Sequence, residues 1–474
     1  MEIKEYYLAV DIGASSGRHI LGSVKDGRII TEEIYRFENK MLEEDGHKVW
    51  DLKYLFKEIL NGLKKCKEIG RIPGAMGIDT WAVDYVLLDE ADRVMGKTYA
   101  YRDERTKDMP TELYKTVPED KLYDITGIQK ASFNTIFQLL AHKRQEPDIL
   151  KNARSFLMLP DYFNFLLTGK KNQEYTNATS TGLVNAKDKC WDKELIKALD
   201  FPTELFSELT LPGKDIGNLK EEIKAEIGFD TKVYAVASHD TGSAVMSVPS
   251  LEENTLYISS GTWSLLGCER LKPDCSKKAR LSNFTNEGGY DYRFRFLKNI
   301  MGLWMIQSVR NELAKKGEEY SFARLCDMAK GGKVDIIIDV SDQRFLAPAS
   351  MIEEVCKAVR EIDKDVLLST ADIARVIYRS LADCYAKSIQ QLETITDRKY
   401  KSLYVVGGGS NAEYLNSLTA EATGLRVYAG PSEATAIGNL GAQFIAGSVF
   451  ASLEEFRRAV MRSFDIKEYT GRQV

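Results

Sequence analysis

The sequence predicts an α/β protein of two large domains, and three observations support this prediction. The chain has 474 residues, which is too long for one ordinary core and favours two domains. Strand-like segments alternate with amphipathic helical segments along much of its length. A strand-turn-strand pattern near the N-terminus returns about 250 residues later, a separation that suits one duplicated domain.

The opening segment has the pattern of three antiparallel strands. Apolar runs cover Tyr7 to Asp11, His19 to Val24 and Arg28 to Phe37. A turn of small residues at Gly13 to Gly17 separates the first two runs, and Asp26-Gly27, a strong hairpin signal, separates the last two. The sequence therefore predicts two consecutive hairpins.

A helix and a parallel strand follow these hairpins. Asp51 is a good N-cap, and the residues after it place one apolar face at a spacing near 3.6 residues: Leu52, Leu55, Phe56, Ile59, Leu60 and Leu63. The apolar segment Gly74 to Asp79 comes next. Because a helical crossover leads to it, we expect this strand to lie parallel to the first in a mixed sheet.

The internal repeat places the domain boundary near the middle of the chain. Leu8 to Gly22 and Leu256 to Gly267 share an apolar strand, a turn of small residues, and a second apolar strand. We therefore predict domains at residues 1–245 and 246–474. Turn signals at four prolines indicate a helix-rich insert at about 110–199 in the first domain.

Composition and charge exclude several classes of function. The formal net charge of −5 argues against nucleic acid as a partner. No apolar stretch reaches the roughly 18 residues of a membrane-spanning helix, and the N-terminal apolar run is too short for a signal peptide. The seven cysteines form no CxxC pair, which is typical of reduced thiols in a cytoplasmic protein.

Two turns of small residues are candidates for phosphate binding. The chain has neither a GxxxxGK[ST] loop nor a GxGxxG turn after a strand. At Gly13 to Gly17 and at Ser259 to Thr262, unobstructed backbone N–H groups can instead converge on anionic oxygens. The alternative is that both are merely tight hairpins.

Two acidic residues follow predicted strands, where ligands of α/β sheets gather. Asp240 ends the strand that starts at Val233, and it can act as a general base or as a helix N-cap. Its neighbour His239 is more often a packed or capping residue. Asp11 ends the first strand and can hold Mg²⁺ or close a turn.

The second half contributes two further patterns. Leu403 to Leu418 predicts a strand, three glycines and a helix start, where backbone can approach a phosphorylated ligand. Asn299 and Gln307 lie eight residues apart in an apolar segment. We predict that one helix carries both, about 12 Å apart along its axis. An amphipathic core helix with polar edges is the alternative.

Five of these segments, in this order, resemble the FGGY carbohydrate kinases: the strand before DIGASSGR, GIDTWAVDYVLLD, ASHDTGSAV, ISSGTWSLLG and VVGGGSNAEYLN. The resemblance covers nearly the whole chain. It implies two duplicated ribonuclease-H-like domains of the actin-like ATPase fold around an interdomain cleft. It also implies a sugar kinase that uses ATP and Mg²⁺. Two segments, LMLPDYFNFLLTG and FLKNIMGLWMIQ, are similar to the corresponding segments of members that phosphorylate O1 of L-rhamnulose.

Carried over residue by residue, the resemblance implies three groups of site residues. The ATP phosphates would contact Ala14, Ser15, Ser16, Gly17 and Arg18. The nucleotide would contact Thr262, Gln307 and Gly408. The sugar would contact His239, Asp240, Thr241 and Asn299, with Asp240 as the base. Asp11 stays the candidate for Mg²⁺.

One departure from the family pattern concerns the sugar pocket. Where the family usually has glycine in GIDTWG, this chain has Ala82, so we predict that Ala82 lies in the sugar pocket and influences ketose preference. L-fuculose and L-xylulose are therefore alternative substrates. An actin-like ATPase without sugar kinase activity is the alternative from another class. A gene-repressing sugar sensor would need a DNA-binding segment before Tyr6. We expect a monomer or homodimer.

Overall fold

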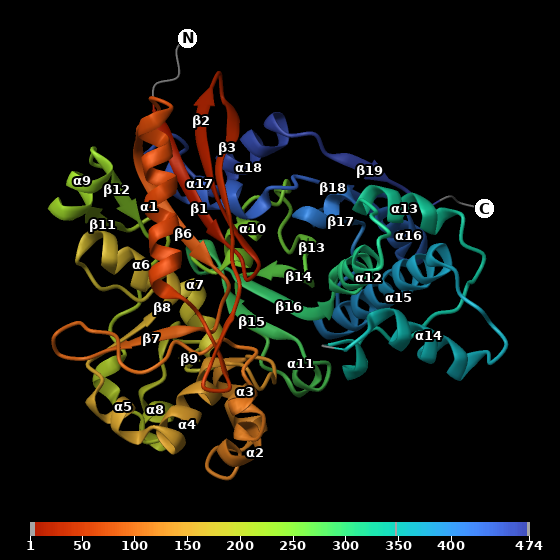
Figure 1. Ribbon diagram of the computed structural model, residues 1–474, viewed down its shortest axis with the longest axis horizontal. Coiled ribbons are helices and arrows are strands. Elements are labelled where there is room, and N and C mark those ends of the chain that lie inside the picture. The colour runs from red at the N-terminus through yellow and green to blue at the C-terminus, as the bar shows by residue number, and fades with distance from the viewer. Residues whose placement is uncertain (1–4, 347, 472–474) are drawn as a thin grey trace. The chain divides into compact units, whose positions relative to one another are not determined.

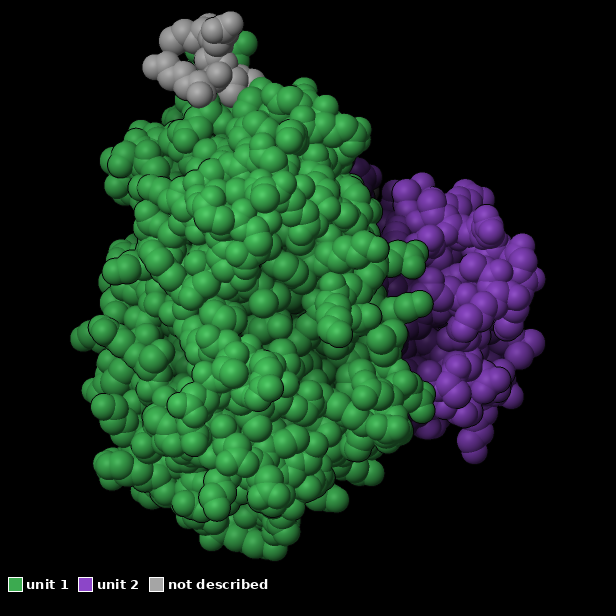
Figure 2. All heavy atoms as spheres, turned by 60° about the vertical axis from the view of Figure 1, so that its left-hand side comes forward, with its two compact units in different colours: residues 1–247, 270–296, 435–463 green, residues 248–269, 297–434, 464–474 purple. Residues whose placement is uncertain are grey.

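The computed structural model describes residues 5–346 and 348–471 and contains two compact units, coloured separately in Figure 2. The first comprises the chain up to Ser247 together with residues 270–296 and 435–463. The second comprises residues 248–269 and 297–434 and the chain from Phe464. The first unit thus adds two later segments to the N-terminal part of the chain. The division into domains at residues 1–245 and 246–474 stays a prediction.

The first sheet has six strands and begins with the predicted hairpins. Strand β1 pairs antiparallel with β2, β2 pairs antiparallel with β3, and β6 lies parallel to β1. The predictions for the first three strands and for the parallel strand are therefore confirmed. In sheet order the strands are β11 (Asp215–Asn218), β12 (Lys232–Tyr234), β6 (Pro73–Thr80), β1 (Tyr6–Ile12), β2 (Ser16–Lys25) and β3 (Arg28–Glu38).

Two helices fix this sheet from different parts of the chain. Helix α1 (Leu52–Glu68) begins as predicted, because the Asp51 side chain accepts a hydrogen bond from Tyr54 N–H at 2.9 Å. Its apolar face joins β1 and β6 in one buried core. Helix α17 (Ala434–Ala446) lies near β1 in Figure 1, and Gln443 Nε2 donates to the Leu8 carbonyl at 2.9 Å.

The predicted helix-rich insert is confirmed, and it has a core of its own built on aromatic residues such as Phe137 and Phe156. Its helices are α2 (Met109–Leu113), α3 (Glu119–Thr126), α4 (Thr135–Gln145), α5 (Pro147–Asn152), α6 (Leu159–Thr168), α7 (Tyr175–Ala178) and α8 (Lys193–Ala198). Two short ladders accompany them: β7 (Tyr85–Leu88) with β8 (Ser155–Met158), and β9 (Val184–Asn185) with β10 (Cys190–Trp191).

The second sheet confirms the internal repeat. Its hairpin of β13 and β14 is antiparallel, and β13 pairs in parallel with β17, as β1 pairs with β2 and β6. In sheet order the strands are β15 (Thr285–Gly288), β16 (Phe294–Met301), β14 (Trp263–Arg270), β13 (Leu256–Ser260), β17 (Ser402–Val406), β18 (Arg426–Ala429) and β19 (Lys467–Tyr469). Most of these residues belong to the second unit.

Helices α13, α15 and α16 pack against one another in the second unit. The longest, α15 (Thr370–Thr396), starts with a capping box between Ser369 and Asp372. Its companions are α12 (Trp304–Lys315), α13 (Phe322–Lys330), α14 (Met351–Ile362) and α16 (Glu413–Thr423). The first unit also has β4 (Leu42–Glu44), β5 (His47–Val49), α9 (Glu221–Ile227), α10 (Asp240–Met246), α11 (Lys277–Leu281) and α18 (Leu453–Ser463). Within the described ranges, no helix combines the length and apolarity needed to cross a membrane.

Two predictions about elements are wrong. Asn299 and Gln307 do not share a helix, because Asn299 lies on β16 and Gln307 on α12. The chain changes direction at Gly302, where a Cβ atom would lie 2.5 Å from the Trp263 carbonyl carbon. The strand that starts near Val233 ends at Tyr234, and the segment after it makes only an isolated bridge between Thr80 and His239.

A close helix crossing determines where α10 lies in the first unit. A Cβ atom at Gly438 of α17 would lie 1.7 Å from the Ser243 carbonyl oxygen of α10. We predict that Gly438→Ala lowers the free energy of unfolding by about 1 to 3 kcal/mol, because the backbone must move apart. Urea denaturation measures this.

The matched control is Gly242→Ala on α10, where the added Cβ would make an ordinary 3.4 Å contact with Thr176. Alanine is also the better helix former. We expect this variant to keep or slightly raise the free energy of unfolding. If Gly438→Ala were as stable as Gly242→Ala, the close crossing would not determine the position of α10.

Candidate active site

Three carboxylates meet at one edge of the first sheet. Strands β1 and β6 lie side by side (Figure 1). Their parallel register places Asp11 opposite Asp79, each near the end of its strand. The segment before α10 arrives at the same edge, because Thr80 N–H donates to the Ser238 carbonyl at 2.9 Å. Asp240 is the first residue of α10. Asp11 and Asp240 were predicted here, whereas Asp79 was not.

The three carboxylates repel one another, and burial strengthens this effect. Burial and the charge of Asp11 raise the pKa of Asp79 well above its ordinary value. The same two causes raise the pKa of Asp240 to about 6. Asp11 is partly neutralised, because Arg18 forms an ion pair with it at 3.0 Å. Asn439 Nδ2 donates to Asp79 Oδ2 at 2.5 Å. The edge thus concentrates negative charge that a cation would stabilise.

Asp240 is held by its neighbours and still reaches solvent. His239, and not Asp240, is the N-cap residue of α10, so Asp240 does not serve as the N-cap. Its Oδ1 accepts hydrogen bonds from Thr241 N–H at 2.5 Å and from Thr241 Oγ1 at 3.1 Å. His239 Nε2 lies 3.3 Å from the same oxygen. The Asp240 side chain keeps 34% of its surface exposed, which suits an acid-base group that meets a ligand.

In the first turn that the sequence predicts to bind phosphate, the carbonyl groups accept hydrogen bonds, and that of Ser16 accepts one from Gly13 N–H at 2.9 Å. Asn39 Nδ2 donates to the Gly13 carbonyl at 2.9 Å, and Asn39 N–H donates to the Ser15 carbonyl at 3.0 Å. Two oxygens that would repel an anion are therefore occupied by Asn39. Ala14 and Ser15 form the turn itself, whereas Ser16, Gly17 and Arg18 begin β2. The turn suits anion binding by its backbone N–H groups.

The second turn uses the same arrangement with different donors. Gly261 and Thr262 join β13 to β14. Their carbonyl groups accept hydrogen bonds, each of 3.1 Å, from the backbone N–H groups of Leu303 and Trp304 at the start of α12. Gly17 and Gly261 differ, however. A Cβ atom at Gly17 would lie 2.1 Å from the Phe37 ring, whereas one at Gly261 would have its nearest neighbour at 4.0 Å.

The other predicted nucleotide residues all belong to the second unit. Gln307 lies in the first turn of α12, and Asn299, predicted on the sugar side, lies on β16 of the same unit. Gly408 follows β17 as predicted and is exposed, with no atom within 4 Å of where its Cβ would be. Gly407 and Gly409 instead pack against Ser260. Gly408 is thus the glycine of the three that is open to a ligand.

A strained turn follows Asp79 at the end of β6. Asp84 N–H donates to the Ala82 carbonyl at 3.0 Å, and Val83 between them has a φ of +68°. A β-branched residue rarely adopts this conformation, and such a γ-turn is strained. The insert holds it, because Thr135 Oγ1 and Gln138 Nε2 donate to the Val83 carbonyl at 2.7 and 3.2 Å. Ala82, half-buried, therefore has a firmly fixed backbone.

Asp84 organises the side chains around this turn, and sequence reasoning missed it. Its carboxylate accepts hydrogen bonds from the Trp50 and Trp81 indoles at 2.7 and 2.9 Å. Gln138 Nε2 at 2.9 Å and Tyr101 N–H at 3.1 Å also donate to it. Burial raises the pKa of Asp84 to about 6, although these four donors counteract it. The two indole rings lie with centroids 4.2 Å apart.

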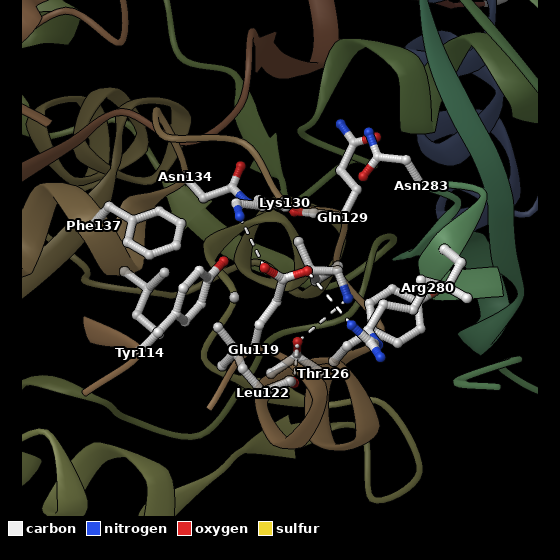
Figure 3. A pocket seen from close by; sticks show the side chains of 15 residues that line it. Tyr114, Glu119, Leu122, Thr126, Gln129, Lys130, Asn134, Phe137, Arg280 and Asn283 are labelled. Carbon is white, nitrogen blue, oxygen red and sulfur yellow. Dashed lines mark hydrogen bonds and ion pairs between the residues drawn. The ribbon is translucent and has the colours of Figure 1, made fainter. Parts of the chain in front are cut away.

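A separate cavity of about 220 Å³ lies between the insert and residues 280–283 (Figure 3). Leu122, Phe137 and Tyr114 are among its lining residues. Its carboxylate, Glu119, is paired with Lys130 at 2.9 Å and with Arg280 at 3.6 Å. None of the predicted site residues lines this cavity, so the candidate site remains the edge that carries Asp11, Asp79 and Asp240.

We predict that Asp84→Ala lowers the free energy of unfolding by about 3 kcal/mol or more, because two buried indoles lose their acceptor and Gln138 and Tyr101 N–H each lose one hydrogen bond. The tryptophan emission should also shift, since two of the five indoles lose their partner. Denaturation followed by fluorescence measures both effects.

The control is Asp89→Ala, which removes a carboxylate that bonds to Arg93 and to exposed turn N–H groups. It should cost less than about 1 kcal/mol, as surface pairs do. Equal losses for the two variants would refute the organising role of Asp84.

Matches to models of protein families cover nearly the whole chain. Residues 6–247 match the N-terminal domain of the FGGY family of carbohydrate kinases, and residues 256–447 match its C-terminal domain. The rhamnulokinase of Halalkalibacterium halodurans is 50% identical over 98% of this chain and 99% of its own. The rhamnulokinases of Oceanobacillus iheyensis and Bacillus subtilis are 48% and 41% identical, covering 98% and 99% of this chain and 97% and 96% of their own.

Solved structures agree in fold. A gluconate kinase and a xylulose kinase from Lactobacillus acidophilus each match with a TM-score of 0.79, at 16% and 17% identity, over 98% of this chain and 93% of theirs. A glycerol kinase from Plasmodium falciparum with ADP matches with a TM-score of 0.77 at 13% identity, over 98% and 94%. At such low identity these likenesses show the fold, and the predicted two-domain α/β fold class is confirmed.

Proposed function

The chain belongs to the FGGY family of carbohydrate kinases, and on this premise we propose that it transfers the γ-phosphoryl group of ATP to O1 of L-rhamnulose. The products are L-rhamnulose 1-phosphate and ADP. The observation that carries the proposal is Asp240, a partly exposed carboxylate on an edge shared with the phosphate-binding turn. The choice of sugar is supported by the names of the curated relatives.

The reaction asks the protein to align donor and acceptor and to stabilise charge. A pKa of about 6 leaves Asp240 ionised at neutral pH, so its carboxylate can accept the O1 proton. The O1–Pγ bond then forms while the bond between Pγ and the bridging β,γ-oxygen breaks, and ADP leaves. Thr241 and His239 hold the Asp240 carboxylate in place during this transfer.

The phosphates would meet Ala14, Ser15, Ser16 and Gly17 through backbone N–H groups and Arg18 through its guanidinium. We propose Thr262, Gln307 and Gly408 for the nucleotide, and His239, Thr241 and Asn299 together with Ala82 for the sugar. The exposure of Gly408 and the occupied carbonyl groups of both turns support these assignments.

Asp11 is the proposed contact for Mg²⁺. Burial first, and the charge of Asp11 second, raise the pKa values of Asp79 and Asp240 beside it, and a hard cation prefers such oxygen donors. The parts of the chain that the structure describes contain no ready-made cluster of three or more metal-ligating side chains. Mg²⁺ is commonly held by one or two carboxylates together with substrate phosphates. When bound, it neutralises charge on the β- and γ-phosphates.

Asp240→Asn tests the proposed base. We predict that the variant binds ATP but loses about 10²- to 10⁴-fold in sugar-dependent turnover, the usual contribution of a general base. A coupled ADP-release assay with L-rhamnulose measures this. A variant within a few-fold of the wild-type rate would reject Asp240 as the base. ATP hydrolysis that no sugar stimulates would instead favour an actin-like ATPase.

We also predict how stability and turnover depend on pH, with Asp240→Asn as the variant for comparison. Because the pKa of Asp240 is raised in the folded protein, its contribution to stability is complete below about pH 4 and is lost as the pH rises through about 6. Asp240→Asn should therefore gain stability relative to wild type over this interval. Wild-type turnover should rise over the same interval as Asp240 ionises. Parallel stability curves for the two proteins would contradict the raised pKa.

Ala82→Gly tests the sugar pocket. A methyl group in a pocket changes relative catalytic efficiency by roughly 10 to 200-fold. We therefore predict a changed ranking of L-rhamnulose, L-fuculose and L-xylulose, with the KM for ATP unchanged. If Ala82 lies outside the pocket, only stability falls, by roughly 0.5 to 1 kcal/mol, and the ratios of catalytic efficiency stay fixed.

That the protein is a monomer or a homodimer stays a prediction.

A further inference from the structure

A buried ion pair next to His239 joins β15 and β16, and neither of its two residues has a role in the proposed mechanism. Arg295 on β16 is 1% exposed, and its Nη1 lies 3.0 Å from Oε2 of the buried Glu287 on β15. Arg295 Nε also donates to the Gly288 carbonyl at 2.9 Å. A guanidinium is normally costly to bury. Here two strands supply its partners, so its position is fixed.

The third contact of this guanidinium determines the state of the His239 ring. Arg295 Nη2 lies 3.1 Å from His239 Nδ1. A guanidinium always carries its protons and can only donate, so Nδ1 must present its lone pair. Burial and the charge of Arg295 lower the pKa of His239 well below its ordinary value. The ring is therefore neutral, and its proton lies on Nε2, 3.3 Å from Asp240 Oδ1.

We propose that Arg295 is a positioning residue for phosphoryl transfer, because it holds His239 in the Nε2-protonated neutral form that places a proton, and not a lone pair, beside Asp240 Oδ1. This inference rests on the proposed role of Asp240 as the base. With the opposite tautomer, the Nε2 lone pair would face the carboxylate and repel it. Asp240 Oδ1 also accepts two hydrogen bonds from Thr241, and a neutral His239 ring beside it leaves the carboxylate oriented and still free to accept a proton.

Glu287 offers the rival arrangement. Its Oε2 lies 3.4 Å from His239 Nδ1, so a proton on Nδ1 would point at Glu287 and leave the Nε2 lone pair facing Asp240. The shorter contact from Arg295 opposes this arrangement, because two hydrogens would then meet between Nδ1 and Nη2. Glu287 instead balances the charge of Arg295.

The ¹⁵N spectrum of the imidazole rings in the full-length protein distinguishes the two tautomers. The chain has four histidines, and loss of a signal in His239→Gln assigns the ring of interest. We expect the wild-type spectrum at pH 7.5 to show His239 neutral, with its proton on Nε2. A proton on Nδ1 would overturn the proposal without any further variant.

Arg295→Met tests the cause of this state. We expect the His239 signal to lose its pure Nε2-protonated form. We also expect kcat with L-rhamnulose to fall about 10- to 100-fold, the scale of a lost charge-assisted hydrogen bond, while the KM for ATP changes less than about twofold. Arg280→Met removes an arginine paired with Glu119 and should change neither quantity. An unchanged His239 signal with wild-type kcat would overturn the proposal.

Arg295→Lys covers the case in which Arg295→Met fails to fold, because lysine keeps a positive donor. It should keep the Nε2-protonated signal and recover part of kcat. Loss of that signal in a folded Arg295→Lys protein would count against the proposal. Absence of sugar-dependent ADP release in the wild type would reject the proposed function. The tautomer would still be read from the spectrum, so the two failures are distinguishable.

Discussion

The crowding of negative charge at one edge of the first sheet is the constraint on which the rest of the site depends. The register of β1 and β6 brings Asp11 and Asp79 together, and α10 adds Asp240. Burial makes this arrangement costly. Arg18 and Asn439 lower the cost by direct contacts with Asp11 and Asp79. The remaining charge is what a cation with bound phosphates would neutralise.

If the two hairpin turns bind phosphate as proposed, they face a second electrostatic problem, because the backbone must present N–H groups to an anion without its carbonyl oxygens. Every peptide unit brings a carbonyl oxygen with its N–H group, and the oxygen repels phosphate. In the first turn Asn39 occupies two such oxygens, and in the second turn Leu303 and Trp304 do so with their own N–H groups. Different sequences thus reach the same local chemistry in the two halves of a duplicated fold.

Strain and polar burial are concentrated next to the proposed sugar contact. Val83 adopts a conformation that a β-branched residue avoids, and Asp84 is a buried carboxylate. Both are maintained by donors from the insert, such as Gln138. The insert therefore stabilises this part of the first unit, because hydrogen bonds from its helix α4 fix the backbone that follows β6. A polar network of this kind holds the backbone at Ala82 in one conformation.

The sequence by itself determined the features that depend on neighbours along the chain. The hairpins, α1 and the carboxylate of Asp11 follow from local patterns of apolar residues, turns and strand ends, and the duplication follows from repetition of one such pattern. Asp240 was placed by a predicted strand end that the structure moves back to Tyr234. Only the tertiary structure decided that Asn299 and Gln307 lie on different elements, and only it revealed Arg295 behind His239. Such relations depend on strand pairing between distant segments, and the energy of a buried polar group is set by partners that local sequence does not specify.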